Sequence, residues 1–144
     1  MFYLSTNGGG NCLAFPDTCM TPGVLAGAPG PLPYPNSGMF SQASGSSCSK
    51  KVTIENKKPC LASKTEISST SGDEAGNSPG GVVSSKFKGK AHCSSSPSST
   101  KVEIEGSKAF SILGITGHNK GGTDNMPAGV QISPSQTKVS TLPA

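Results

Sequence analysis

Two histidines and five cysteines are the side chains of this sequence best suited to holding a metal ion. The histidines, His92 and His118, are both expected in loops rich in glycine and serine, outside the strands. Together with Cys19 and Cys93 they form a set of two imidazoles and two thiols, which suits tetrahedral Zn²⁺ in a structural site. The sequence therefore predicts a structural zinc ion with these four residues as its ligands.

The positions of these residues qualify the zinc prediction. Their spacing is not that of a zinc finger. His92 and Cys93 are neighbours, so they would point to opposite faces of a strand and can share an ion only if the chain is looped there. Cys12 and Cys60 are alternative ligands. Cys60 also suits a small apolar position in a strand, and Cys48 is expected in an exposed loop.

The N-terminus and the number of thiols bear on where the chain is made. The sequence starts without a basic segment or an apolar stretch long enough for a signal peptide. No window is long and apolar enough to predict a membrane span. An odd number of cysteines fits poorly with a closed set of disulfides. We therefore expect synthesis in the cytoplasm, where thiols are more often buried or bound to metal than paired.

Signs of a catalytic site are weak. A hydrolase could use Cys19 or Cys93 as nucleophile, but no nucleophile elbow or cysteine-protease signature surrounds either residue. The glycines at 8–10 lack the following strand and helix of a phosphate-binding loop. Asp73 and Glu74 fall in a loop of turn-forming residues. We therefore expect a protein that is not an enzyme.

The net charge of +4 comes from lysine alone, because the chain contains no arginine. The lysines are spread singly among expected strands and turns. Proteins that bind nucleic acids usually gather arginine and aromatic residues on one face. Single lysines more often lie on strand edges, where they discourage pairing with other chains. We therefore expect no nucleic-acid partner.

One phrase occurs twice, fifty residues apart. Lys-Val-Thr-Ile-Glu-Asn-Lys-Lys at 51–58 returns as Lys-Val-Glu-Ile-Glu-Gly-Ser-Lys at 101–108, and a third Lys-Val pair stands at 138–139. The alternation of apolar and polar residues in these phrases is typical of strands. A repeat that cannot bury a face by itself must stack on its copies or on a partner. The repeats therefore predict a small all-β body with internal symmetry.

The remaining segments favour strands and loops over helices. No segment keeps a helical spacing over three turns, so we expect very little helix. Strands are expected at 51–55, 60–67, 82–90, 101–105, 109–115, 130–132 and 138–139, with long loops at 68–81 and 94–100. The proline-rich stretch 16–36 is expected to run extended across a surface, outside any sheet. A proline-rich ligand for an adaptor domain is the alternative for that stretch.

The composition leaves little material for a hydrophobic core. Only 32% of the residues are apolar, no tryptophan is present, and there are 19 glycines and 12 prolines. Such a β protein needs a metal, disulfides or a partner surface to hold its fold. Two alternatives stay open: a disordered scaffold, and an adhesin-like β module of the extracellular type, for which the chain offers few aromatic residues.

Five segments, taken in order, resemble the PAAR-like spike-tip proteins of bacterial type VI secretion systems and related contractile injection systems. The segments are Pro16–Pro22, Pro33–Asn36, Gly72–Gly76, Gly80–Ser84 and Pro134–Val139. The two repeat copies resemble the strand-turn-strand unit of that family. At the places of its Pro-Ala-Ala-Arg motif this chain has Pro-Cys-Leu-Ala at 59–62 and Ala-Phe-Ser-Ile at 109–112.

The resemblance implies a small β cone over residues 1–144, as a single domain without an effector extension. Its broad base would bind the blunt end of a trimeric VgrG-like spike, one tip per trimer, without forming a homo-oligomer. Zinc would pin the strands near the apex, which would contact the target membrane transiently. Effector proteins are implied as further partners. The protein would be assembled at the spike tip and delivered outside the cell or into a target cell.

Overall fold

The computed structural model describes residues 2–95 and 101–142, and this part of the chain is all-β, as the sequence predicts. The regular helix within it is one 3₁₀ turn at Phe40–Gln42, and no helix there is long and apolar enough to cross a membrane. The strands are β1 (Phe2–Tyr3), β2 (Asn11–Leu25), β3 (Ala28–Met39), β4 (Glu66–Ile67), β5 (Thr70–Ser71), β6 (Gly80–Gly81), β7 (Lys90–Cys93), β8 (Glu103–Ile104), β9 (Ser107–Lys108), β10 (Ile115–Lys120), β11 (Met126–Gln131) and β12 (Ser140–Thr141).

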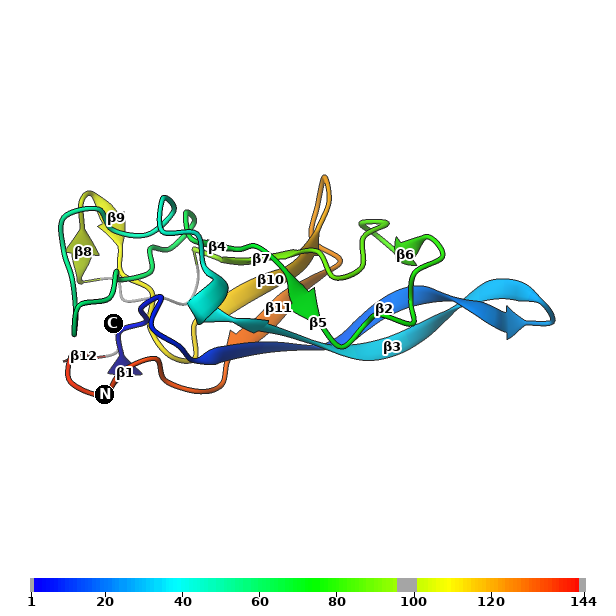
Figure 1. Cartoon of the computed structure of the whole chain (residues 1–144), viewed down its shortest axis with the longest axis horizontal. Coiled ribbons are helices and arrows are strands. Elements are labelled where there is room, and N and C mark those ends of the chain that lie inside the picture. Colours follow the sequence, from blue (N-terminus) through cyan, green and yellow to red (C-terminus); the bar gives the residue numbers. More distant parts are fainter. Residues whose placement is uncertain (1, 96–100, 143–144) are drawn as a thin grey trace.

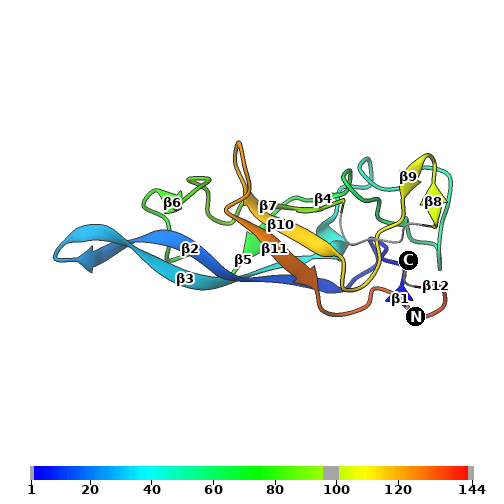
Figure 2. The ribbon, with the colours of Figure 1, turned by 180° about the vertical axis from the view of Figure 1, so that it is seen from behind.

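The molecule is broad at one end and narrow at the other. Figure 1 shows β1, β8, β9, β12 and both chain ends at the broad end, and the β2–β3 hairpin projecting alone at the opposite end. Figure 2 shows the same taper from behind. The expected cone-shaped β fold is thus confirmed.

One large sheet fills the middle of the molecule. Its strands follow the order β4-β7-β10-β11-β2-β3-β5, and β6 pairs with β2 beside this path. All the pairs are antiparallel. The register brings Gly117 of β10 opposite His92 of β7, and Thr116 opposite Cys93. His92 and Cys93 therefore stand on β7, and His118 stands on the neighbouring β10. The expectation that both histidines lie in loops is wrong, because both pair within the large sheet.

The proline-rich stretch corrects one prediction. It is extended, but it forms the longest hairpin of the sheet, in which Thr18 pairs with Pro33 and Met20 with Pro31. Alternate residues of a strand direct their N–H groups to opposite edges. The prolines of β3 stand at every second position, 29 to 35, so they remove donors from one edge and leave the other free to pair with β2.

The strand expected at 82–90 is also wrong. The chain makes turns and bends from Val82 to Gly89, and the strand β7 starts only at Lys90. Side chains take over the N–H groups of this loop: the Asn125 amide oxygen accepts from Val83 N at 2.8 Å, and the Asp73 carboxylate from Lys88 N at 3.1 Å. The segment with the alternating pattern is therefore a loop, and hydrogen bonds to side chains hold it in place.

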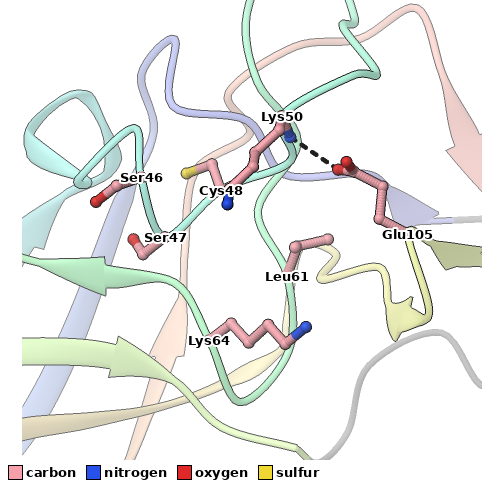
Figure 3. Close-up of a pocket in the computed structure, with 7 residues that line it drawn as sticks. All are labelled: Ser46, Ser47, Cys48, Lys50, Leu61, Lys64 and Glu105. Carbon is pink, nitrogen blue, oxygen red and sulfur yellow. Dashed lines mark hydrogen bonds between the residues drawn. The ribbon is translucent and has the colours of Figure 1, made fainter.

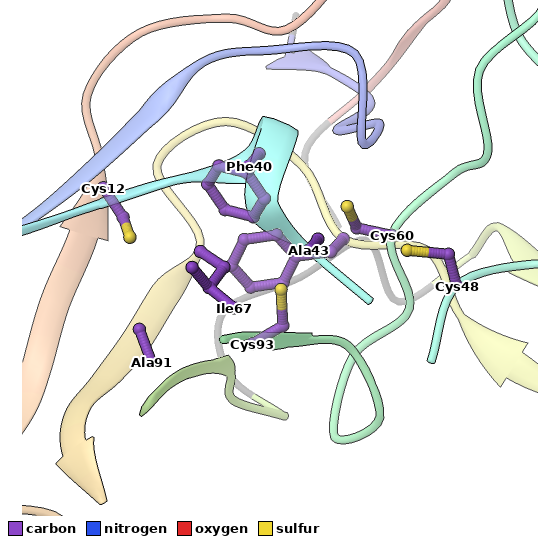
Figure 4. Packing of buried hydrophobic residues seen from close by; sticks show 9 residues of the cluster. Cys12, Phe40, Ala43, Cys48, Cys60, Ile67, Ala91 and Cys93 are labelled. Atoms are coloured by element: carbon purple, nitrogen blue, oxygen red, sulfur yellow. The ribbon is translucent and has the colours of Figure 1, made fainter. Parts of the chain in front are cut away.

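Two hydrophobic clusters form the core. The larger one contains four of the five cysteines, which Figure 4 shows with Phe40 and Ile67. The rings of Phe40 and Phe110 pack in this cluster with their centroids 6.1 Å apart. Cys48 belongs to it with 3% of its surface exposed, so its expected place in an exposed loop is wrong. Cys60 is buried, as expected of a small apolar residue. The smaller cluster lies at the broad end and consists of Leu4, Ile54, Leu61, Ile104 and Ala109.

Candidate functional site

The broad end is built around three short chain segments that repeat one hydrogen-bond pattern. The segments are 3–7, 58–62 and 108–112, and their central residues are Ser5, Cys60 and Phe110. Cys60 N donates to Ser5 O at 2.8 Å, Ser5 N to Phe110 O at 2.8 Å, and Phe110 N to Cys60 O at 3.0 Å. The three bonds close a ring in which every segment gives one bond and receives one.

A second cycle of three bonds lies two residues away from each centre, and its donors and acceptors run around the axis in the opposite sense. Asn7 N donates to Lys58 O at 2.9 Å, Ala62 N to Lys108 O at 2.9 Å, and Ile112 N to Tyr3 O at 2.9 Å. Antiparallel bridges link the intervening positions, and they are Thr6–Pro59, Leu61–Ala109 and Leu4–Ser111. The three segments are therefore related by a pseudo-threefold axis.

A hairpin precedes each segment, and two of the hairpins are the repeated phrases. Ile54 pairs with Lys57 in the first copy, and Ile104 with Ser107 in the second. Both turn residues of each hairpin have positive φ: 51° and 62° at Glu55 and Asn56, 52° and 76° at Glu105 and Gly106. Positive φ at both central residues is the mark of a type I′ turn.

The third hairpin is assembled from both ends of the chain. Tyr3 pairs with Ser140 and Phe2 with Thr141, in the register that Lys108 and Ser107 keep with Glu103 and Ile104. The bond from Leu4 N to Val139 O likewise matches the bond from Ala109 N to Val102 O. The Lys-Val pair at 138–139 is therefore the start of a third copy, which the N-terminus completes. We call the three hairpins, 50–58, 101–108 and 138–142 with 2–3, the threefold face.

A pocket opens beside two of these hairpins (Figure 3). It is lined by Ser46, Ser47, Cys48, Lys50, Leu61, Lys64 and Glu105. The Glu105 carboxylate accepts hydrogen bonds from Ser49 Oγ at 2.5 Å and Lys50 N at 2.7 Å, and these bonds lower the pKa of its carboxyl group. Glu105 thereby ties the second hairpin to the start of the first.

A second group of polar side chains is buried between β2, β3, β10 and the loop before β7. Asp17 and Asp73 are both fully buried, and the Asn119 side chain lies between them. Its Nδ2 donates to Asp17 Oδ2 at 2.6 Å and to Asp73 Oδ2 at 2.5 Å. Asn36 donates to Asp17 as well, at 2.7 Å, and Asn125 also donates to it. Burial raises the pKa of Asp17, and the nearby Asp73 adds to this effect. We call these residues, with His118, the polar cluster.

His118 is fully buried at the edge of this cluster. Its Nδ1 lies 3.1 Å from Asn36 Oδ1, and its Nε2 lies 3.0 Å from Thr116 Oγ1. Because the Asn36 amide nitrogen donates to Asp17, its oxygen must accept, so His118 carries its proton on Nδ1. Burial, with a smaller effect from His92, lowers the pKa of His118 to about 4. The ring is therefore neutral at pH 7.

The other predicted zinc ligands have different neighbours. His92 Nε2 lies 2.8 Å from Asp124 Oδ1. Cys19 Sγ donates to Asp73 Oδ2 at 3.9 Å, and burial with the charges of Asp17 and Asp73 raises its pKa to about 12. Cys93 packs in the larger hydrophobic cluster. Each of the four side chains is thus engaged by its own protein partners.

The donors therefore do not fit a shared tetrahedral zinc site in this arrangement. Among residues 2–95 and 101–142, no three His, Cys, Asp or Glu side chains are grouped so that they could hold a metal ion. Zinc ligation by His92, His118, Cys19 and Cys93 stays a prediction, to be tested by metal analysis of the purified protein.

Sequence reasoning missed the polar cluster. Asp17 and Asn36 both lie more than eighty positions before Asn119 in the sequence, and no motif links the three residues. The available signal was their position: Asp17 and Asn36 lie in two of the segments that resemble the PAAR-like family, and Asn119 follows His118. Every buried side-chain nitrogen and oxygen of the described residues has a hydrogen-bond partner, so the cluster is internally complete.

Comparison with known proteins matches the Toxin PAAR-like domain to residues 10–126. A DNase toxin of Pseudomonas aeruginosa, Tse7, is 34% identical over 114 residues, which are 77% of this chain and 28% of the toxin. The match thus spans less than a third of that relative. No solved structure matches the chain significantly. The matched residues include most of the large sheet and two of the three hairpins. On this ground the chain belongs to the Toxin PAAR-like domain family.

Proposed function

We propose that this chain is the tip of a trimeric VgrG-like spike in a type VI secretion system or a related contractile injection system. The observation that carries the proposal is the threefold face. Three hairpins and three chain segments repeat one hydrogen-bond pattern around one axis within a single chain. A monomer with such a face can make the same contacts with each subunit of a trimer.

The shape of the molecule supports a mechanical role. The threefold face is at the broad end, and the opposite end narrows to the β2–β3 hairpin (Figure 1). A cap of this shape would reduce a blunt spike end to a point. The polar cluster ties β2, β3 and β10 to the loop before β7, so the middle of the cone is cross-linked by side chains. The tip would then resist bending when it meets a membrane.

The matched relative is named as a toxin, which bears on the cargo. The chain corresponds to 28% of that DNase toxin. We propose that this part serves to attach a toxin to the spike and has no enzymatic activity itself, with an effector carried on the same or another chain. Assembly would take place in the bacterial cytoplasm, and delivery would carry the tip out of the cell.

The test is assembly with a spike trimer encoded by the same genome. Native mass spectrometry of the mixture should give a complex of one copy of this chain with three spike subunits. As a matched control, a chain lacking residues 138–142 has only two hairpins and should bind the trimer far more weakly. A complex with three copies per trimer, or no complex at all, would contradict the proposed function.

A further inference from the structure

The positive charge of the chain is not spread over the molecule but is concentrated on the threefold face. The three hairpins hold seven of the twelve lysines and three of the eight acidic residues, which gives +4, the net charge of the whole chain. The remaining five lysines and five acidic residues cancel. The lysines of the face are Lys50, Lys51, Lys57, Lys58, Lys101, Lys108 and Lys138.

Three of these lysines occupy equivalent positions. Lys51, Lys101 and Lys138 begin the three copies, and all three are exposed. Each lies three residues before a paired residue of its hairpin, which is Ile54, Ile104 or Thr141. The next residue of each copy is a valine. Val52 and Val139 are 40% and 39% exposed, while Val102 packs against the smaller hydrophobic cluster. Each of the three copies therefore contributes one exposed lysine and one valine to the threefold face.

Resting on the proposed function, we propose that the spike end bound by this face carries a ring of three carboxylates, one from each subunit, that pair with Lys51, Lys101 and Lys138. Opposite charge on matched positions steers the encounter of two proteins and fixes their register. A threefold partner can satisfy all three lysines with one kind of side chain. Nucleic acids and lipid surfaces have no threefold symmetry, so they do not explain the equivalent spacing.

The experiment measures binding of the spike trimer to lysine variants. An exposed ion pair contributes about 0.2–1 kcal/mol, which is a factor of about 1.4 to 5 in affinity. Each of Lys51→Gln, Lys101→Gln and Lys138→Gln should weaken binding by a similar factor in this range, and the triple variant by the product of the three factors, about 3- to 100-fold. Raising the salt from 50 to 300 mM should weaken wild-type binding and affect the triple variant less.

Lysines away from the face provide the control. Lys86, Lys88 and Lys90 are exposed in the loop before β7 and at its start. A triple glutamine variant at these positions removes the same charge and should bind like wild type. In addition, charge reversal of all three face lysines to glutamate should be rescued by a spike whose terminal acidic ring is changed to lysine.

The outcomes separate the two proposals. If wild type forms the one-to-three complex but the triple variant binds within twofold of it, the carboxylate ring is refuted and the proposed function stands. If wild type does not bind the trimer, both fail. If wild type binds DNA or anionic vesicles more tightly than the trimer, and the face variant loses that binding, the face belongs to another partner and the carboxylate ring is refuted as well.

Discussion

At the scale of single residues, two buried carboxylates without a cationic partner are the least ordinary feature of this chain. Burying a charge without compensation costs several kcal/mol, so such groups need hydrogen bonds or a raised pKa. Asp17 has both: three asparagine side chains donate to it, and burial raises its pKa. Asn119 joins Asp17 to Asp73 and also accepts from Gly89 N at 2.8 Å. The stability of the narrow half of the cone should therefore depend strongly on Asn119.

Replacing Asn119 by leucine tests this dependence. The substitution keeps the number of side-chain heavy atoms but removes the donor shared by the two carboxylates, and it places a leucine at a φ of 50°. We therefore expect the free energy of unfolding to fall by about 3 kcal/mol or more. Denaturant titration followed by circular dichroism measures the loss. Asn77→Leu, at an exposed position between β5 and β6, is the control and should change stability by less than about 0.5 kcal/mol. Equal effects of the two changes would refute the role given to Asn119.

At the scale of elements, the repeated phrases predicted two related β elements, and the structure has a hairpin with a type I′ turn in each. Asn56 and Gly106 hold the same place in the two phrases, and both adopt the left-handed conformation that these residue types favour. Ile54 and Ile104, which hold the same place in the two phrases, are both buried in the smaller cluster. Here local chemistry and tertiary packing agree, so a local pattern was sufficient.

Elsewhere the local pattern was misleading for physical reasons. Prolines at every second position of β3 suggested a strap outside the sheet, although they spare one edge for pairing. The alternating segment 82–90 became a loop because distant side chains, Asn125 and Asp73, satisfy its N–H groups. Lysines that seemed scattered along the sequence gather on one face because the three hairpins that carry them surround one axis. None of these outcomes can be seen without knowing which segments are neighbours in space.

The turn at Gly106 gives a prediction at this scale. Nothing lies within 4 Å of a Cβ atom at this position, so a larger residue meets no clash and only the backbone conformation opposes it. Gly106→Val should therefore lower the free energy of unfolding by about 1–2 kcal/mol, the cost of a left-handed L-residue. Asn56→Gly at the equivalent turn should be neutral or slightly stabilising, as measured in the same denaturant titrations. A tolerated valine would show that the turn does not need positive φ.

At the scale of the whole molecule, one copy of the repeat is divided between the chain ends. The first two hairpins are continuous, and the third joins Ser140–Thr141 to Phe2–Tyr3. The described ends lie side by side at the broad end in both views (Figures 1 and 2). A pseudo-threefold face of this kind does not depend on which hairpin is interrupted. The face should therefore survive if the interruption is moved from one hairpin to another.

Circular permutation makes this move directly. Thr141 and Phe2 stand where Ile104 and Ser107 stand in the second copy, so an Asn-Gly linker from 141 to 2 would rebuild a two-residue turn. New ends between Glu105 and Gly106 in one permutant, and between Glu55 and Asn56 in another, then interrupt a different hairpin each time. Because the closed and opened loops are equally short, both permutants should fold with unfolding free energies within about 1 kcal/mol of each other.

The control permutant carries the same linker but opens the chain between Cys19 and Met20, inside the longest hairpin. It should lose the pairing of β2 with β3 and β6 and fail to give a cooperative unfolding transition. The two hairpin permutants should also form the one-to-three complex with the spike trimer, since the threefold face is regenerated in each. Two outcomes would show that the three copies are not equivalent. In one, only the unpermuted chain folds; in the other, one of the hairpin permutants folds but does not bind the trimer. The symmetry on which both the docking mode and the lysine ring depend would then be lost.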